Sequence, residues 1–176
     1  MKTQVLYHAN CPDGFCAAWA AYTRFGDDAE YIPVQYGQDP PDVAGNRVYI
    51  VDFSYKRDVL LDMVSRTSNI TILDHHKTAA ADLEGFADEC MRVYGLIPPT
   101  VVFDMNKSGG RLAWEHFHPG RDTPWLVDYT EDRDLWRWNL PESRAVNAGL
   151  SAQPKDFAAW CDLEADPDSL ERMRFD

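Results

Sequence analysis

Apolar residues along the chain fall into two alternating patterns, short runs and stretches of helical spacing. The short runs are rich in β-branched residues, which is typical of buried strands, and they lie at 4–8, 30–36, 47–52, 70–73 and 99–104. Helical spacing separates them, at 14–25, 57–66, 79–94 and after Ser108, a plausible N-cap. Strands that alternate with helices favour a parallel sheet covered by helices on both faces. We therefore predict a doubly wound α/β fold, followed by a mostly helical C-terminal segment from Pro124.

Length, charge and cysteine usage narrow the class of protein. The chain has 176 residues, enough for one domain with a substantial core, and 17 basic against 29 acidic residues give a net charge of -12. That charge argues against binding long duplex nucleic acid, whereas small anions can bind where a metal supplies positive charge. The cysteines match neither a CxxC pair nor a zinc-knuckle spacing; they are Cys11, Cys16, Cys90 and Cys161. With no signal-peptide core and no membrane-spanning run, we expect reduced thiols in a cytoplasmic protein that does not associate with membranes.

Polar residues follow three of the predicted strands. His8 and Asp13 follow the first strand, Asp52 ends the third, and the segment 74–76, Asp-His-His, ends the fourth. Ligands of open α/β sheets bind outside the carboxyl ends of the strands, so these side chains are expected to converge. Taken singly, each has an ordinary explanation: a histidine pair on the surface, His8 at a strand end, Asp52 as a helix cap, Asp13 serving the Gly14 turn.

Together the strand-end residues predict a metal site. Imidazole and carboxylate ligands without a nearby thiolate suit manganese, iron, cobalt or zinc. A carboxylate such as Asp52 can bridge two ions, and two ions about 3.5–4 Å apart can assist an in-line phosphoryl displacement. A further acidic segment, 132–134, follows later in the chain.

Four segments resemble the successive motifs of the DHH phosphoesterases, a family of exonucleases, nano-RNases, cyclic-dinucleotide phosphodiesterases and polyphosphatases. The segments are 8–14, 51–54, 73–77 and 132–136, in that order, and the resemblance covers residues 5 to about 150. A DHH tripeptide alone is a weak signal, but all four motifs together are specific. The sequence is most similar to the short phosphohydrolases and nano-RNase relatives whose fourth motif ends in Asp-Leu/Ile-Trp.

The resemblance implies a doubly wound domain at 1–150 that holds two divalent ions, usually Mn²⁺, which activate a water against a phosphoester. It implies His8, Asp13, His75 and Asp134 as metal ligands, with Asp132 as the fallback for Asp134, and Asp52 as the bridging ligand. His76 would contact phosphate, and Asp74 would orient His75 rather than bind a metal directly. The residues assigned to catalysis are therefore His76, Asp74 and Asp52.

Two departures from the family pattern change these expectations. The first motif usually has a second acid, whose nearest equivalent here is Asn10, so we expect Asn10 to be a weak ligand that lowers the affinity of one site. The family's C-terminal substrate-binding domain has no counterpart here, and we expect residues 151–176 to form a short helical extension.

The sequence thus predicts a metal-dependent phosphoesterase that acts on small nucleotide-type esters such as very short oligonucleotides. The alternatives are a nucleotide-binding or regulatory domain with little turnover, and a pyrophosphatase or polyphosphatase. Candidate substrate-binding residues flank the expected ligands; they are His76, Lys77, Ser108, Gly109, Gly110 and Arg133. Trp136 and Trp138 would either stack on bases or, more commonly, belong to the core.

Overall fold

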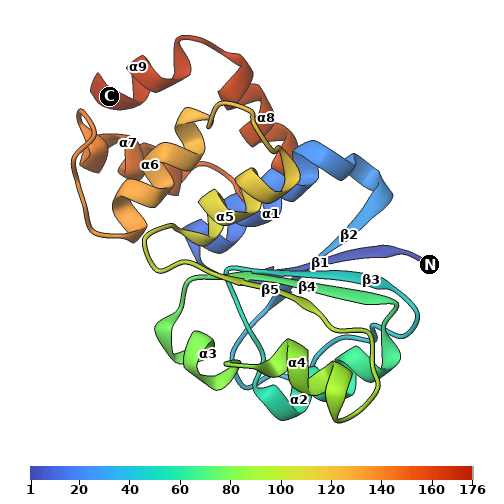
Figure 1. Ribbon diagram of the computed structural model, residues 1–176. Helices are drawn as coiled ribbons and strands as arrows, with labels where there is room; N and C mark the ends of the chain where they lie inside the picture. Colours follow the sequence, from blue (N-terminus) through green and yellow to red (C-terminus); the bar gives the residue numbers. More distant parts are fainter. Residues whose placement is uncertain (176) are drawn as a thin grey trace.

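Five parallel strands form the sheet at the centre of the computed structural model, which describes residues 1–175 (Figure 1). The strands are β1 Thr3–His8, β2 Ala29–Val34, β3 Arg47–Val51, β4 Asn69–Asp74 and β5 Thr100–Phe103. Their order in the sheet is β2-β1-β3-β4-β5, and every neighbouring pair is parallel. The predicted parallel sheet is confirmed.

Each central strand has two buried faces. In β1, Val5 packs into the core on one side of the sheet and Leu6 into the core on the other. In β3, Val51 and Ile50 divide in the same way. Successive side chains of a strand point to opposite faces, so a strand covered on both sides needs a continuous apolar run. The short runs in the sequence are therefore the central strands of a sheet enclosed by helices.

Helices cover both faces of the sheet, which confirms the doubly wound α/β fold. One face is covered by α1 Pro12–Phe25 and α5 Gly109–Phe117. The other is covered by α2 Arg57–Arg66, α3 Lys77–Asp82 and α4 Phe86–Arg92. A short 3₁₀ helix, Gly26–Asp28, links α1 to β2.

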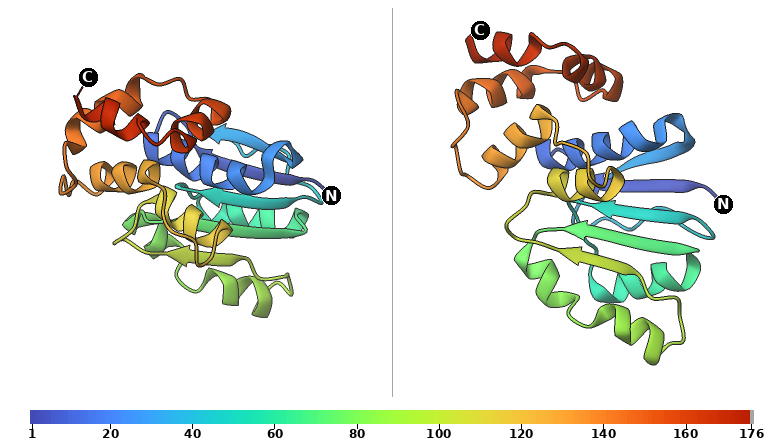
Figure 2. Two further views of the ribbon diagram at one scale, coloured as in Figure 1. Left: turned by 90° about the horizontal axis from the view of Figure 1, so that it is seen from above. Right: turned by 45° about the horizontal axis from the view of Figure 1, so that its top comes forward.

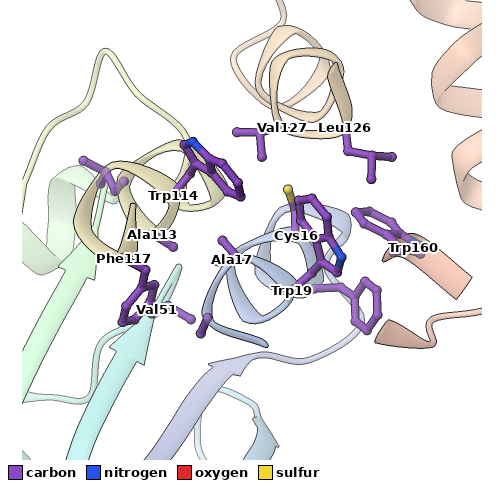
Figure 3. Packing of buried hydrophobic residues seen from close by; sticks show 14 of the residues in the cluster. Cys16, Ala17, Trp19, Val51, Ala113, Trp114, Phe117, Leu126, Val127 and Trp160 are labelled. Carbon is purple, nitrogen blue, oxygen red and sulfur yellow. The ribbon is translucent and has the colours of Figure 1, made fainter. Parts of the chain in front are cut away.

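A second layer of helices lies outside α1 and α5 (Figure 2). It contains α6 Trp125–Asp134, α7 Ser143–Ala152, α8 Phe157–Ala165 and α9 Ser169–Phe175, so the predicted helical C-terminal segment is confirmed. The interface is aromatic: Trp19 of α1 is buried, stacks with Trp114 of α5 at 5.9 Å between ring centroids and touches Trp160 of α8 (Figure 3). Helix α1 is consequently enclosed between the sheet and the second layer.

Some predicted boundaries differ from the structure. The single helix expected at 79–94 is two helices, α3 and α4, because the chain turns at Gly85 with φ 71°. Helix α1 begins at Pro12 rather than at Gly14, since proline suits the first turn of a helix, where its missing N–H costs nothing. Ser108 caps α5 as expected, its side chain accepting a hydrogen bond from the Arg111 amide at 3.2 Å.

The described part of the chain contains four free cysteines. None of its helices combines the length and the apolar character needed to cross a bilayer.

Candidate metal centre

The site lies where the connections of the sheet diverge. From β1 the chain passes to β2 on one side, and from β3 it passes to β4 and β5 on the other. Such a switch point leaves a crevice outside the carboxyl ends of the strands. His8 ends β1, Asp52 follows β3 directly, and Asp74 ends β4. The sheet thus brings three of the predicted motifs to one edge.

Asp52 occupies the centre of this edge. Its φ is 53°, a left-handed conformation that aspartate tolerates better than most residues, and its amide donates to the Leu73 carbonyl at 2.9 Å. The side chain is only 1% exposed; its Oδ1 lies 3.2 Å from His75 Nε2 and its Oδ2 lies 3.6 Å from His8 Nδ1. The two oxygens therefore face two different histidines. Asp52 does not cap α2, whose N-cap is Lys56.

His75 links Asp52 to two further carboxylates. Its Nε2 lies 3.8 Å from Asp13 Oδ2 and 3.6 Å from Asp134 Oδ2. Asp134 is the last residue of α6, so a helix of the second layer contributes to the site. The structure thus brings together all five residues expected to converge, which are His8, Asp13, Asp52, His75 and Asp134.

The N-terminus of α5 holds Asp13 in place. The Gly109 amide donates to Asp13 Oδ2 at 2.5 Å, and the Gly110 amide donates to Asp13 Oδ1 at 2.9 Å. A Cβ on Gly109 would lie 2.4 Å from Asp52 Cβ, and one on Gly110 would lie 3.0 Å from Asp13 Oδ1. Only glycine lets the helix start approach so closely. These two amides therefore donate to a carboxylate of the chain, and the predicted contact of Gly109 and Gly110 with substrate stays a prediction.

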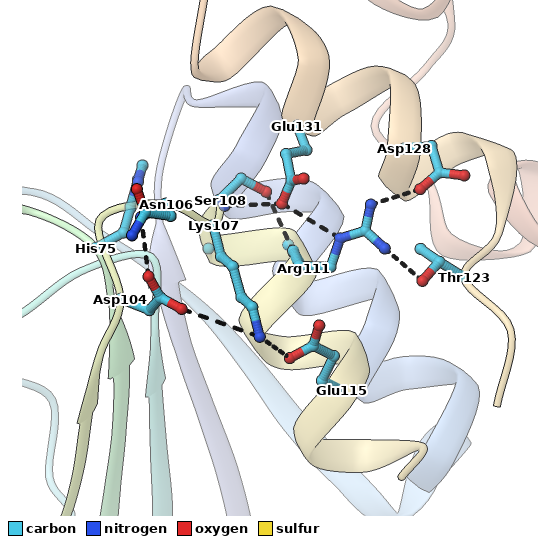
Figure 4. Close-up of polar contacts among 12 residues, drawn as sticks. His75, Asp104, Asn106, Lys107, Ser108, Arg111, Glu115, Thr123, Asp128 and Glu131 are labelled. Atoms are coloured by element: carbon cyan, nitrogen blue, oxygen red, sulfur yellow. Dashed lines mark hydrogen bonds and ion pairs between the residues drawn. The ribbon is translucent and has the colours of Figure 1, made fainter. Parts of the chain in front are cut away.

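Glu131 fixes the start of α5 to α6 (Figure 4). Its Oε2 accepts from the Ser108 amide at 3.1 Å and from Arg111 Nε at 3.2 Å. Its Oε1 accepts from Arg137 Nη1 at 2.8 Å, so this buried carboxylate has a cationic partner on each side. Sequence analysis missed Glu131, because its partners are up to 23 residues away and an acidic helical stretch is usually ordinary surface. Ser108 is fully buried as a helix cap, and its predicted contact with substrate stays a prediction.

Asp74 orients His76, whereas we expected it to orient His75. Asp74 Oδ1 lies 2.6 Å from His76 Nδ1 and also accepts from the His75 amide at 2.8 Å. The reason is geometric: the chain turns after β4, so the carboxylate folds over the next two amides and meets the second ring. The imidazole of His75 is left free to point at Asp52.

Mutual attraction and repulsion control the charges in the cluster. Burial opposes the charged form of Asp52, but the hydrogen bond with His75 and the nearby His8 imidazole outweigh it and lower the Asp52 pKa to about 2. Burial likewise opposes the charge on His75, but the bond to Asp52 and the charges of Asp13, Asp52 and Asp134 raise its pKa to about 9. Burial, reinforced by the charge of Asp52, raises the pKa of Asp13 and of Asp134. Burial is thus the largest cause of the raised carboxyl pKa values in the cluster.

Three ionisable groups of the cluster have buried atoms without a hydrogen-bond partner in the described chain. These atoms are His8 Nδ1, Asp52 Oδ2 and Asp74 Oδ2. Buried polar atoms are nearly always hydrogen-bonded, and bound cations would give these atoms the partners that they lack. The cluster contains three overlapping groups, and within each group the ligand atoms lie within 4.8 Å of one another. The first group is His8, Cys11 and Asp52, and the second is Asp13, His75 and Asp134. The third is Asp52, Asp74, His75 and His76. The residues present therefore fit divalent metal ions.

Cys11 takes the place in the cluster that we expected for Asn10. Asn10 is exposed and has a left-handed φ of 57°, and Pro12 starts α1 two residues later. Between them the half-buried Cys11 lies beside His8 and Asp52, and burial together with the Asp52 charge raises its pKa to about 12. The sequence Asn-Cys-Pro could have indicated this arrangement, because asparagine favours left-handed turns and proline favours helix starts.

Asp132 lies outside the cluster, which corrects its assignment as the fallback ligand. Its Oδ1 accepts from the Asn139 amide at 2.9 Å and its Oδ2 from the Leu140 amide at 3.3 Å. Burial opposes its charge, but hydrogen bonds from Ser143 and these amides lower the pKa of Asp132. It is an anchor for the loop after α6. Lys77 is exposed at the first position of α3, and its contact with substrate stays a prediction.

Comparisons with known proteins identify similarity but no function. No family model and no solved structure matches the sequence. The chain is 29% identical over 172 residues to the uncharacterized protein R106 of Acanthamoeba polyphaga mimivirus, an alignment that covers 89% of this chain. The chain spans 38% of the length of that relative.

Proposed function

We propose that the protein is a divalent-metal-dependent phosphoesterase of the DHH type that hydrolyses small nucleotide-type phosphoesters. The observation that carries the proposal is the position of Asp52, whose two carboxylate oxygens face His75 and His8 at 3.2 and 3.6 Å. A carboxylate between two sets of ligands can bridge a pair of ions. The resemblance of the four sequence motifs to the DHH phosphoesterases supports the same reading.

The described residues divide into two ligand sets that share Asp52. His8, with Cys11 beside it, would hold one ion, and Asp13, His75 and Asp134 would hold the other. Mn²⁺ is the ion that the resemblance implies, and imidazole and carboxylate ligands suit it. When bound, such ions lower the pKa of water and neutralise charge on a phosphoryl group.

The ring of His76 lies beside the cluster and is held by Asp74. The hydrogen bond to the buried Asp74 raises the pKa of His76, which favours the imidazolium. With Nδ1 engaged by Asp74, the proton at Nε2 lies on the opposite side of the ring, where it can be donated to a phosphate oxygen or to a leaving group. Asp74 thus acts as a positioning residue for His76.

The proposal is tested by the metal content of the purified protein and by hydrolysis assays with added Mn²⁺. The substrates are bis-p-nitrophenyl phosphate, a dinucleotide, a cyclic dinucleotide, adenosine bisphosphate and pyrophosphate. We expect bound transition metal, and phosphodiester hydrolysis that disappears in Asp52→Asn. A protein that binds Mn²⁺ without hydrolysing any ester would instead be a binding or regulatory domain, and cleavage of pyrophosphate alone would identify a pyrophosphatase.

A further inference from the structure

A hollow of about 540 Å³ adjoins the metal centre between α6 and α7. Its lining includes Pro12 of α1, Asp134 and four larger side chains that we call the tryptophan subsite: Arg133, Trp136, Trp138 and Arg144. The volume lies within the range of about 300–1,000 Å³ that is usual for small-molecule sites. Asp134 lines this hollow and also lies 3.6 Å from His75, so the hollow and the cluster share Asp134.

Trp136 is held in an exposed position by the backbone around it. Its side chain is 78% exposed and its φ is 53°, a conformation that bulky residues rarely adopt. The Trp136 amide donates to the Arg133 carbonyl at 3.0 Å, and the carboxylate of Asp132 fixes the far end of the loop through Asn139 and Leu140. Strained backbone that surrounding bonds enforce is typical of functional sites. The indole of Trp136 is thus presented to solvent by a fixed loop beside the metal centre.

Trp138 and Arg144 form the second wall of the hollow. The Arg144 guanidinium lies 4.4 Å from the centre of the Trp138 ring, and the two indoles of Trp136 and Trp138 meet edge to face at 6.0 Å. Trp138 Nε1 is buried and has no hydrogen-bond partner in the described chain.

Two arginines place positive charge here in a chain whose net charge is -12. Arg133 donates one hydrogen bond, from Nη1 to Ser151 Oγ at 2.7 Å, and its remaining N–H groups can serve a ligand. Neither Arg133 nor Arg144 forms a salt bridge within residues 1–175. A guanidinium is planar and matches phosphate oxygens in pairs, so the two side chains favour an anionic ligand.

We propose that the tryptophan subsite binds a nucleobase, stacked on Trp136, together with a phosphate held by Arg133 and Arg144. Given the proposed function, on which this assignment rests, the reacting phosphate lies at the metal centre and the adjoining nucleoside occupies the hollow. The substrate class is then a nucleoside phosphate with a second phosphate, such as a dinucleotide or a nucleoside bisphosphate.

Equilibrium binding of adenosine 5′-monophosphate, followed by tryptophan fluorescence, tests the stacking. Ribose 5-phosphate, which lacks the base, is the reference ligand. We expect adenosine monophosphate to bind more tightly, and Trp136→Ala to reduce its affinity by roughly 5- to 150-fold, the range given by loss of one stacked base, without weakening ribose phosphate. Phe175→Ala, which removes an equally exposed aromatic residue at 76%, is the matched control and should change neither affinity.

Arg144→Ala tests the phosphate contact, with the exposed Arg92 of α4 as the matched control. We expect Arg144→Ala to weaken both ligands and Arg92→Ala to weaken neither. Equal affinities for the two ligands, or an unchanged affinity for adenosine monophosphate in Trp136→Ala, would overturn the subsite. Binding requires no turnover, so this result is independent of whether any ester is hydrolysed. Hydrolysis lost in Asp52→Asn with unchanged binding in Trp136→Ala would leave the phosphoesterase standing and remove only the subsite.

Discussion

Asp13 and Gly109 are joined by a hydrogen bond of 2.5 Å, although they are 96 residues apart in the chain. The bond places the partial positive charge of the α5 N-terminus against a carboxylate that faces His75 at 3.8 Å. The carboxylate of the first motif is thus oriented by a helix that lies outside the four sequence motifs. Correct docking of α5 is therefore a condition for assembling the ligand set.

Gly109→Ala should disturb the site through packing. The new Cβ would lie 2.4 Å from Asp52 Cβ and 2.8 Å from Asp52 Cα, and neither atom can move without the backbone. We expect the free energy of unfolding to fall by about 1–3 kcal/mol, as for other overpacked sites, and Mn²⁺ affinity to fall with it. Gly149→Ala is the control, because its Cβ would meet only the flexible Met173 side chain at 3.2 Å. Denaturant unfolding and metal titration of both variants measure the two quantities. A Gly109→Ala variant with the stability and Mn²⁺ affinity of the wild type would contradict the prediction.

Asp52→Asn should remove metal binding while keeping the fold. Asparagine also tolerates the φ of 53° found at this position, so the backbone is not strained further. The change removes the charge between His8 and His75, and we expect Mn²⁺ affinity to drop by at least about 10- to 100-fold. Asp104→Asn is the control, since Asp104 also follows a strand but pairs with Lys107. Isothermal titration measures the affinities; equal losses in the two variants would argue against a bridging role for Asp52.

Substitutions in the first motif distinguish Asn10 from Cys11 as a ligand. Because Asn10 is exposed, we now expect Asn10→Asp to leave the Mn²⁺ activation curve superimposable on that of the wild type. Cys11 lies with His8 and Asp52, so the Co²⁺-loaded protein should show a sulfur-to-cobalt charge-transfer band that Cys11→Ser abolishes. Cys161→Ser, at a half-buried cysteine of α8, should retain the band. A band that persists in Cys11→Ser would exclude this thiol.

Metal binding should release a proton from His75. In the metal-free protein the pKa of His75 is raised to about 9, so its imidazole is protonated at neutral pH, whereas a metal requires the neutral ring. We expect Mn²⁺ affinity to rise with pH and to level off above about 9. Calorimetry in buffers of different ionisation enthalpy measures the proton count near neutral pH. No release there would contradict the position assigned to His75.

Glu164 should make the free energy of unfolding fall as the pH rises, whereas a carboxylate paired with a cation makes it rise. Burial raises its pKa from 4.5 to about 7, and its Oε2 has no hydrogen-bond partner in the described chain. The folded state then binds the proton more tightly than the unfolded state, so stability is lost as pH rises from about 4.5 to about 7. Glu164→Gln should remove this slope and stabilise the protein near neutral pH by about 1–3 kcal/mol. Denaturant unfolding across this pH range checks it, with the exposed Glu171→Gln as the control that should keep the slope.

Local sequence was sufficient for the strands and for the rim residues. A strand buried on both faces needs a continuous apolar run, and His8, Asp52 and Asp74 stand directly at or after such runs. The parallel order then places them at one edge whatever the details of packing. The helix break at Gly85 was not visible, because Leu83 and Phe86 pack into the same core and keep a helical spacing across the turn.

Contacts between distant segments were beyond the reach of sequence patterns. The Gly109 and Gly110 amides donate hydrogen bonds to Asp13, and the Ser108 amide donates one to Glu131. These bonds depend on how α5 docks against α1 and α6. Periodicity identifies the buried face of a helix but not the neighbour that covers it. For the same reason, the sequence could not show that Asp132 anchors a loop whereas Asp134, only two residues later, is the candidate ligand.

Phe157 of α8 stacks on Phe15 of α1 at 5.0 Å, and Trp160 meets the same ring edge-on at 4.9 Å. During synthesis, α1 leaves the ribosome long before α8 exists. At roughly 5–20 residues per second, the intervening stretch of chain takes about 7 to 30 seconds to appear. For that time the aromatic face of α1 has no partner from α8, and the nascent chain offers it to chaperones or to another copy of itself. Yield during expression should therefore respond to chaperone supply through Phe15, a residue that packs in the aromatic core rather than in the ligand cluster.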